Sequence, residues 1–304
     1  MKKFITLFLI SLLSACGGGY VSINYTSGQS STNVCPVAPL TQSNVADVIT
    51  STSALQTNIL PAKYHFVTDI QIANSISQCS NGYPSLVINK YILDPTTGIL
   101  LSNALNTIQS LAQQSPNLVQ NTHFMIEVSD EPFWNKTASD TNQSQSLLQA
   151  IQWLRQYFPY AQLGITLPAT WNTDPNLFPS ASQIIPYLDW VAMDTYSQDA
   201  NSTGYNLSIN NATQFAQWMD NNFPNTPKWL IFQGFSPTNS PTINQWSSSD
   251  IQNFENFIST MNSIANQSYN GWMAWGWSNV NELPPQYAGK YFPSNVQSFY
   301  LSLH

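Results

Sequence analysis

Charged side chains are scarce in this chain of 304 residues: they make up 8% of it, against 42% hydrophobic and 13% aromatic residues. The formal net charge is −7, and the few lysines and arginines form no cluster. Because phosphate binding needs a basic surface, this composition argues against nucleic acid as a partner. Solubility then rests on Asn, Gln, Ser and Thr, which suits a well-packed exported globular protein.

Cysteine and histidine are also rare, with three of each. The histidines share no ligand spacing with one another or with the cysteines, so a zinc site is not expected. No cofactor is implied, although an acidic cluster could hold a calcium ion incidentally. Apart from Cys16, the cysteines are Cys35 and Cys79, which are expected to form a disulfide in an oxidising compartment. Two free buried thiols are the alternative.

Long apolar runs are lacking after the first residues, so no transmembrane helix is expected in the rest of the chain. At the start, two lysines precede an apolar stretch at residues 4–13 that is too short to span a bilayer. Leu-Ser-Ala-Cys at residues 13–16 resembles the lipobox of bacterial lipoproteins. The resemblance implies a signal peptide at residues 1–15, a lipid on Cys16 and anchoring to a membrane of the bacterial cell envelope. A plain secretory signal with a chance cysteine is the alternative.

The remainder divides into a tether and one domain. Glycines and a run rich in Ser, Thr and Asn indicate a flexible tether at residues 16–34. Residues 35–304 contain no evident linker or internal repeat, and their number is normal for a single large barrel.

Short apolar runs with amphipathic stretches between them predict alternating strands and helices. The strands are expected at residues 64–70, 86–91, 123–128, 163–167, 190–193, 229–232 and 271–275, with an eighth around 20–25 or 45–49. The helices are expected at residues 102–114, 144–158, 215–223 and 250–265. This alternation predicts an α/β fold, a single (β/α)8 TIM-type barrel with an irregular first strand. An open doubly wound sheet is the alternative, but no Gly-rich phosphate loop follows an early strand.

A barrel of this kind carries its functional residues just after the C-terminal ends of its strands. The candidates there are Asp130, Glu131, Trp134, Trp171, Asp194, Tyr196, Gln233, Trp275 and Trp277. Glu127, Asp130 and Glu131 bring three of the fifteen acidic residues together. Crowded carboxylates raise one another's pKa, which would keep one protonated near neutral pH as a general acid. The alternative is that Asp130 caps a turn and Glu131 lies in solvent.

Two of these motifs resemble those of barrel glycoside hydrolases. Asp-Glu-Pro at residues 130–132 is similar to the Asn-Glu-Pro motif of the retaining-glycosidase clan that includes cellulase-like enzymes, whose glutamate is the acid/base. Trp-Gly-Trp at residues 275–277 looks like the final-strand tryptophans that line their sugar subsites. The resemblance implies a glycan substrate and Glu131 as general acid. Gln233 departs from it, because that clan places a glutamate nucleophile there and an amide forms no stable glycosyl-enzyme ester.

Two other arrangements stay open. Residues 191–196 are somewhat similar to the Met-x-Tyr-Asp element of chitinase-like barrels, where the N-acetyl group of the substrate attacks. The aspartate that orients this group there is missing here, unless Asp130 replaces it. An inverting pair is the other arrangement, in which Glu131 and Asp194 or Asp69 hold a water between them. Glu131 with Asp194 is favoured, although Asp194 could instead serve only loop amides or the nearby tyrosine.

Three functions follow from these residues. The favoured one is a glycoside hydrolase acting on an envelope or environmental polysaccharide, with Trp275 and Trp277 stacking on sugar rings. The alternative is a non-catalytic glycan-binding lipoprotein on a degenerate hydrolase barrel, which Gln233 supports. The third is a structural lipoprotein whose strand-end acids serve loop hydrogen bonds. A second acid within catalytic range of Glu131 distinguishes the first two, and the lack of an open groove at Trp275, Trp277 and Tyr196 would favour the third.

Overall fold

Eight parallel strands form a closed barrel and follow one another around it in chain order. The computed structural model describes residues 35–36, 45–49, 62–80, 82–134, 136–169, 177–197, 199–237, 239–276 and 287–303. The strands are β1 (Val45–Ile49), β2 (Tyr64–Val67), β3 (Tyr83–Val87), β4 (Met125–Asp130), β5 (Gln162–Leu167), β6 (Trp190–Asp194), β7 (Lys228–Gln233) and β8 (Gly271–Trp275). The predicted (β/α)8 TIM-type barrel is therefore confirmed. The first strand lies at Val45–Ile49, and residues 20–25 lie outside the described residues.

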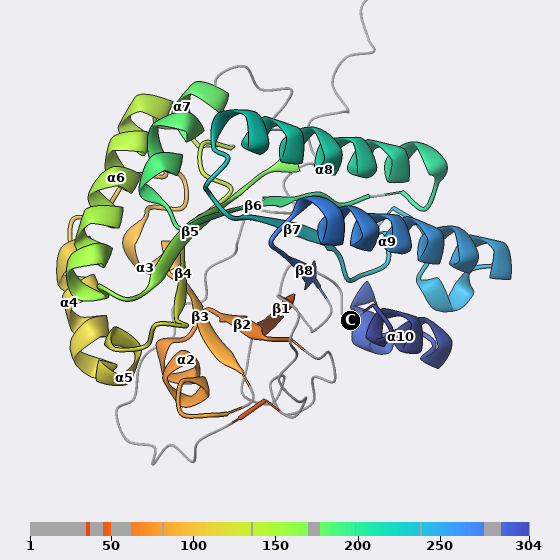
Figure 1. Ribbon diagram of the computed structural model, residues 1–304, viewed down its shortest axis with the longest axis horizontal. Coiled ribbons are helices and arrows are strands. Elements are labelled where there is room, and N and C mark those ends of the chain that lie inside the picture. Colours follow the sequence, from red (N-terminus) through yellow and green to blue (C-terminus); the bar gives the residue numbers. More distant parts are fainter. Residues whose placement is uncertain are drawn as a thin grey trace, which may run out of the picture.

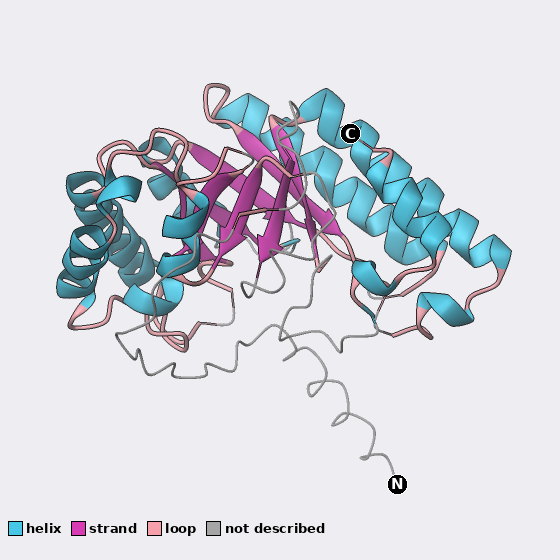
Figure 2. Ribbon diagram, turned by 90° about the horizontal axis from the view of Figure 1, so that it is seen from below, coloured by secondary structure: helices cyan, strands magenta, loops and turns pink. Residues whose placement is uncertain are grey.

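Helices surround the barrel, as Figures 1 and 2 show. The α-helices are α2 (Ile70–Ile76), α3 (Asn89–Ile92), α4 (Ala104–Gln114), α5 (Pro116–Val119), α6 (Asp140–Tyr157), α7 (Leu177–Ile184), α8 (Ser202–Asn222), α9 (Ser248–Ser268) and α10 (Ser294–Leu301). Short 3-10 helices occupy Ile185–Tyr187, Ile243–Gln245 and Gly289–Tyr291. The long helices α6, α8 and α9 each begin after a residue whose side chain accepts a hydrogen bond from the first turn, namely Ser139, Asn201 and Ser247.

Three predicted elements differ from the observed ones. The strand predicted at 86–91 is β3, which begins earlier and includes Pro84, a residue that argues against a strand because it lacks an N–H. The strand predicted at 64–70 ends at Val67, because the Asp69 side chain accepts from Gln71 N at 2.7 Å and starts α2. The helix predicted at 215–223 is the second half of α8, whose first half is too polar to show an apolar period.

The hydrophobic core has two parts. One fills the barrel, with large side chains such as Tyr64, Phe66 and Trp190 inside it. The other lies between the barrel and the helices and is the larger of the two. Gly164 of β5 allows the interior packing, because a Cβ at this position would lie 2.0 Å from the Trp190 ring. The barrel interior is therefore a packed core, and its free space for chemistry lies at the strand ends.

The N-terminal part of the described chain is joined to the barrel at two places. Cys35 and Cys79 form a disulfide with their Cα atoms 5.7 Å apart, which ties the chain before β1 to the end of α2. Asp47 of β1 and His65 of β2 form a buried pair, with Oδ1 and Nδ1 2.8 Å apart. Within the described ranges, no helix is both long and apolar enough to cross a membrane.

Candidate active site

The carboxyl-rich site begins with an irregularity in β4. The pairing of β4 with β5 shifts register between Glu127 and Ser129, so that Glu127 lies opposite Gly164 and Asp130 opposite Thr166. Such bulges re-aim side chains and are common beside active sites. The backbone N–H of Glu131 then donates to the Thr166 carbonyl at 2.9 Å and continues the pairing by one residue. The bulge thus decides which β4 side chains reach the barrel mouth.

Glu127 lies deepest in the site. Its side chain is buried, and the Thr166 hydroxyl donates to its Oε1. Burial, and next the negative charge of Asp130, raise the pKa of Glu127 well above its ordinary value. Glu127 therefore keeps its proton to a higher pH than an ordinary glutamate does, below the residues that end the strand. Thr166 was not among the predicted site residues, although a polar side chain in the apolar run of β5 was a signal for it.

Glu131 and Asp194 form the centre of the site. Asp194 ends β6 and is 8% exposed, and its carboxyl group donates a hydrogen bond to that of Glu131. Burial, and then Asp130, raise the pKa of Glu131 to about 7, although the bond from Asp194 lowers it. Burial, and then the charge of Glu131, raise the pKa of Asp194 well above its ordinary value. The pair therefore keeps a proton to a higher pH than two separate carboxyl groups would.

The direct bond between these two carboxyl groups bears on the inverting arrangement. An inverting pair needs carboxyl groups about 6.5–9.5 Å apart to hold a water, and a retaining pair about 5–5.5 Å. Glu131 and Asp194 lie close enough for each carboxyl group to change the pKa of the other, and the inverting arrangement stays a prediction. Asp69, the other partner considered, caps α2 through its bond from Gln71 N.

Aromatic rings line the mouth beside this pair. Tyr196, Phe235 and Trp275 follow or end β6, β7 and β8, and their ring centroids lie 5.2–5.5 Å apart. Phe235 is buried, whereas Tyr196 and Trp275 are partly exposed. The partly buried Trp134 follows Glu131 in the same turn. Trp171 and Trp277, also predicted to bind substrate, lie outside the described residues.

Gln233 lies beneath the mouth at the end of β7. Its side chain is fully buried, and its Oε1 accepts from the Ser197 N–H at 2.9 Å. The Tyr300 hydroxyl donates to its backbone carbonyl at 2.7 Å. In the described part of the chain, Gln233 Nε2 has no hydrogen-bond partner. Gln233 thus supports the segment after β6 from below.

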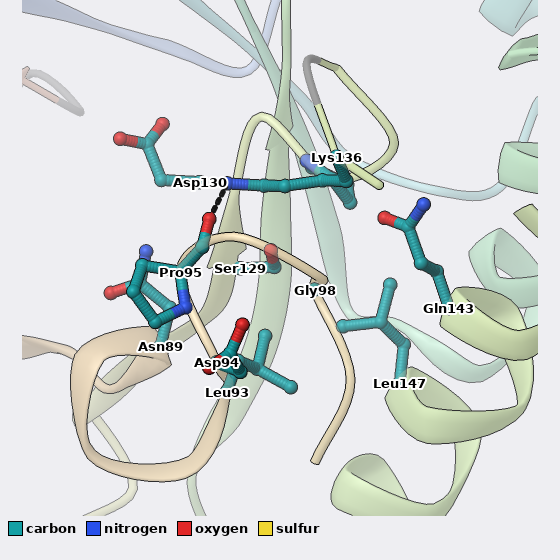
Figure 3. Close-up of a pocket in the computed structure, with 11 residues that line it drawn as sticks. Asn89, Leu93, Asp94, Pro95, Gly98, Ser129, Asp130, Lys136, Gln143 and Leu147 are labelled. Atoms are coloured by element: carbon teal, nitrogen blue, oxygen red, sulfur yellow. Dashed lines mark hydrogen bonds between the residues drawn. The ribbon is translucent and has the colours of Figure 1, made fainter. Parts of the chain in front are cut away.

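A small cavity lies beside the C-terminal end of β4. Its volume of about 20 Å³ suits about one water, and its lining includes Asp94, Asp130, Lys136 and Gln143. Figure 3 shows Gln143 on one side of the cavity, while the Asp130 carboxylate points away from it. This cavity is therefore separate from the Glu131–Asp194 pair. No group of three or more His, Cys, Asp and Glu side chains among the described residues could hold a metal ion.

The closed (β/α)8 barrel is the fold of several solved glycoside hydrolases to which this chain is similar. One similar structure is a family 128 endo-β-1,3-glucanase from Amycolatopsis mediterranei, with TM-score 0.51 and 14% identity over 90% of this chain and 100% of the other. A family 10 xylanase from Thermobacillus composti gives TM-score 0.57 and 8% identity over 86% and 97%. A fungal β-1,4-galactanase gives TM-score 0.54 and 12% identity over 79% of this chain and 87% of the other. These likenesses show the fold alone. No protein-family model and no curated protein matches the sequence.

Proposed function

We propose that this protein is a glycoside hydrolase acting on an envelope or environmental polysaccharide, with Glu131 as the general acid. One observation carries the proposal: Glu131 follows β4 and Asp194 ends β6, so that two carboxyl groups meet at the barrel mouth, where burial raises the pKa of Glu131 to about 7. A general acid needs a pKa near the working pH, so that it is protonated and can still give up its proton. Tyr196 and Trp275 are partly exposed, and the exposed parts of their rings can pack against a sugar.

The cluster gives each carboxyl group a distinct role. Glu131 donates its proton to the oxygen of the glycosidic bond, which leaves with the departing sugar. The hydrogen bond from Asp194 then stabilises the carboxylate that forms on Glu131. A water molecule adds to the anomeric carbon in place of the departing sugar and returns a proton to this carboxylate. Asp130 provides negative charge, which raises the pKa of both partners and stabilises the positive charge of an oxocarbenium-like transition state. Glu127 supports the strand end by accepting a hydrogen bond from the Thr166 hydroxyl.

The test is hydrolysis by the purified chain of the three glycans that the similar structures suggest: β-1,3-glucan, xylan and β-1,4-galactan. We expect release of reducing ends from at least one, and a loss of about 100-fold or more in Glu131→Gln. The matched control is Glu255→Gln on α9, far from the strand ends in sequence and outside the site, which should keep full activity. Equal activity of Glu131→Gln and the parent would refute the role of Glu131.

A non-catalytic glycan-binding protein is the second candidate, and Gln233 favours it. Gln233 is an amide at the position where the retaining-glycosidase clan has its nucleophile, and its burial keeps it from acting as a nucleophile itself. Binding of the same glycans, measured by calorimetry, without release of reducing ends at any pH would support this candidate over the first.

We further propose that a lipid on Cys16 anchors the protein to a membrane of the bacterial cell envelope. The lipobox-like residues 13–16 support this proposal. Labelling with a clickable palmitate in a bacterial host should mark the parent chain and fail in Cys16→Ala, which should also leave the membrane fraction. A Cys16→Ala chain that stays labelled and membrane-bound would refute the anchor.

A further inference from the structure

Glu131 belongs to a turn with an unfavourable backbone. Glu131 has φ 45° and Phe133 has φ 72°, and both lie in the left-handed region although neither is glycine. Residues with a Cβ adopt this region only where the surrounding structure holds them there. The bond from Glu131 N to the Thr166 carbonyl holds the start of the turn. The far end of the turn, at Phe133, needs a separate contact to hold it in place.

Gln143 supplies that contact. It lies in the first turns of α6, and its side chain is 1% exposed. Its Oε1 accepts from the Phe133 N–H at 3.1 Å, and its Nε2 donates to the Ala138 carbonyl at 2.9 Å. One amide therefore fastens two points of the segment that connects Glu131 to α6.

A hairpin on the other side fixes Gln143 itself. Leu93 pairs with Leu100, and Gly98 at the tip has φ 72°. A Cβ on Gly98 would lie 2.6 Å from Gln143 Oε1, so the hairpin packs directly against the amide. The hairpin also binds the segment after the turn, since Thr137 N donates to Thr96 O at 3.0 Å. Lys136 Nζ donates to Pro95 O at 2.9 Å, as Figure 3 shows.

We propose that Gln143 is a positioning residue for catalysis: it holds the left-handed turn so that the Glu131 carboxyl meets Asp194. This inference rests on the proposed function for its effect on rate, but its structural part stands without it. Gln143 touches neither carboxyl group of the pair, and its effect passes through the Phe133 backbone.

Release of the turn has a defined electrostatic consequence. The charged or titratable groups that act on Glu131 are Asp130 and Lys136 on its own segment and Asp194 on β6, with Glu127 close by on β4. Burial is the largest cause of the raised pKa of Glu131. A freed turn exposes the carboxyl group to water, so the pKa of Glu131 should fall from about 7 toward its ordinary value of 4.5.

The experiment is a pH titration of the side-chain carboxyl carbons by NMR in chain labelled with ¹³C-glutamate, which contains only four glutamates. The variants are Gln143→Met, which has a similar size but no amide, and Gln143→Asn, whose shorter amide cannot reach both the Phe133 N–H and the Ala138 carbonyl. Gln145→Met is the matched control, because Gln145 is an exposed residue of the same helix. Comparison with Glu131→Gln assigns the Glu131 signal.

We expect Gln143→Met and Gln143→Asn to lower the pKa of Glu131 by about one unit or more, and Gln145→Met to leave it raised. On a hydrolysed glycan, Gln143→Met should also lower kcat at least about tenfold with KM little changed. An unmoved titration in folded Gln143→Met overturns the inference. If Gln143→Met does not fold, an unmoved pKa of Glu131 in Gln143→Asn overturns the inference and a lowered one supports it. If no variant or parent cleaves a glycan but the titration moves, the proposed function fails and the positioning role stands.

Discussion

The surroundings of Glu131 set its pKa. Burial and the nearby charge of Asp130 disfavour the carboxylate, whereas the hydrogen bond from Asp194 favours it. These influences oppose one another, and burial is the largest, so the pKa settles at about 7 and not near the ordinary 4.5. The chemistry of the site therefore depends on which groups face a single carboxyl group.

Two substitutions of Asp194 test whether its hydrogen bond to Glu131, and not its size, sets the pKa of Glu131. Asp194→Ala removes the bond that stabilises the Glu131 carboxylate, so we expect the pKa of Glu131 to rise by about one unit. Asp194→Asn keeps a donor of the same shape and should leave the pKa near its present value. The alkaline limb of the pH–rate profile, or the ¹³C titration of Glu131, measures both. An identical shift in the two variants would show that the hydrogen bond does not set the pKa.

The sequence predicted part of this site and missed the rest for physical reasons. Asp130, Glu131 and Asp194 were predicted because they follow strands, and parallel strands converge at their C-terminal ends. The direct contact of Glu131 with Asp194 depends on the β4 bulge and on left-handed backbone at two residues other than glycine. Local sequence carries no signal for either feature. Gln143 was missed for a similar reason, since a polar residue early in a helix looks like an exposed one.

The presence of each strand was easier to predict than its first and last residues. Seven apolar runs indicated seven strands because each is buried on both faces, between the barrel interior and the helices. Their ends were less accurate where a single side chain decides the boundary, as Asp69 does at the start of α2. The polar first half of α8 was missed because its cap at Asn201, and not an apolar period, marks its start.

Packing between β5 and β6 gives a prediction for these elements. A Cβ on Gly164 would lie 2.0 Å from the Trp190 ring, inside a filled barrel. We expect Gly164→Ala to destabilise the fold by about 3 kcal/mol, measured by urea denaturation. The double variant Gly164→Ala with Trp190→Phe should recover part of this loss, because the smaller ring leaves room. Equal stability of Gly164→Ala and the parent would contradict this packing.

At the scale of the whole molecule, the buried acids set how stability depends on pH. The folded pKa of Glu127 is raised above the ordinary 4.5, so the folded state keeps a proton that the unfolded chain releases. Between pH 4.5 and the raised pKa, the folded state therefore loses stability as pH rises. Glu131 and Asp194 act in the same direction. We expect the melting temperature to be higher at pH 5 than at pH 8.

Glu127→Gln tests this dependence at one residue. The amide can still accept from the Thr166 hydroxyl and carries no proton to lose, so its stability relative to the parent should increase with pH above 4.5. The gain is about 1.4 kcal/mol for each pH unit, up to the folded pKa. Thermal melts at several pH values measure it, with Glu255→Gln as the control. A constant difference between Glu127→Gln and the parent from pH 4 to pH 8 would contradict a raised pKa of Glu127.

The central claim is that Glu131 cleaves a glycosidic bond as a protonated acid, and the pH–rate profile of glycan hydrolysis tests it most directly. With β-1,3-glucan, xylan or β-1,4-galactan as substrate, the account predicts a rate that falls on the alkaline side with a midpoint near pH 7, where Glu131 loses its proton. Glu131→Gln should abolish nearly all of this rate. Hydrolysis that continues unchanged through pH 9, or glycan binding without any hydrolysis, would contradict it.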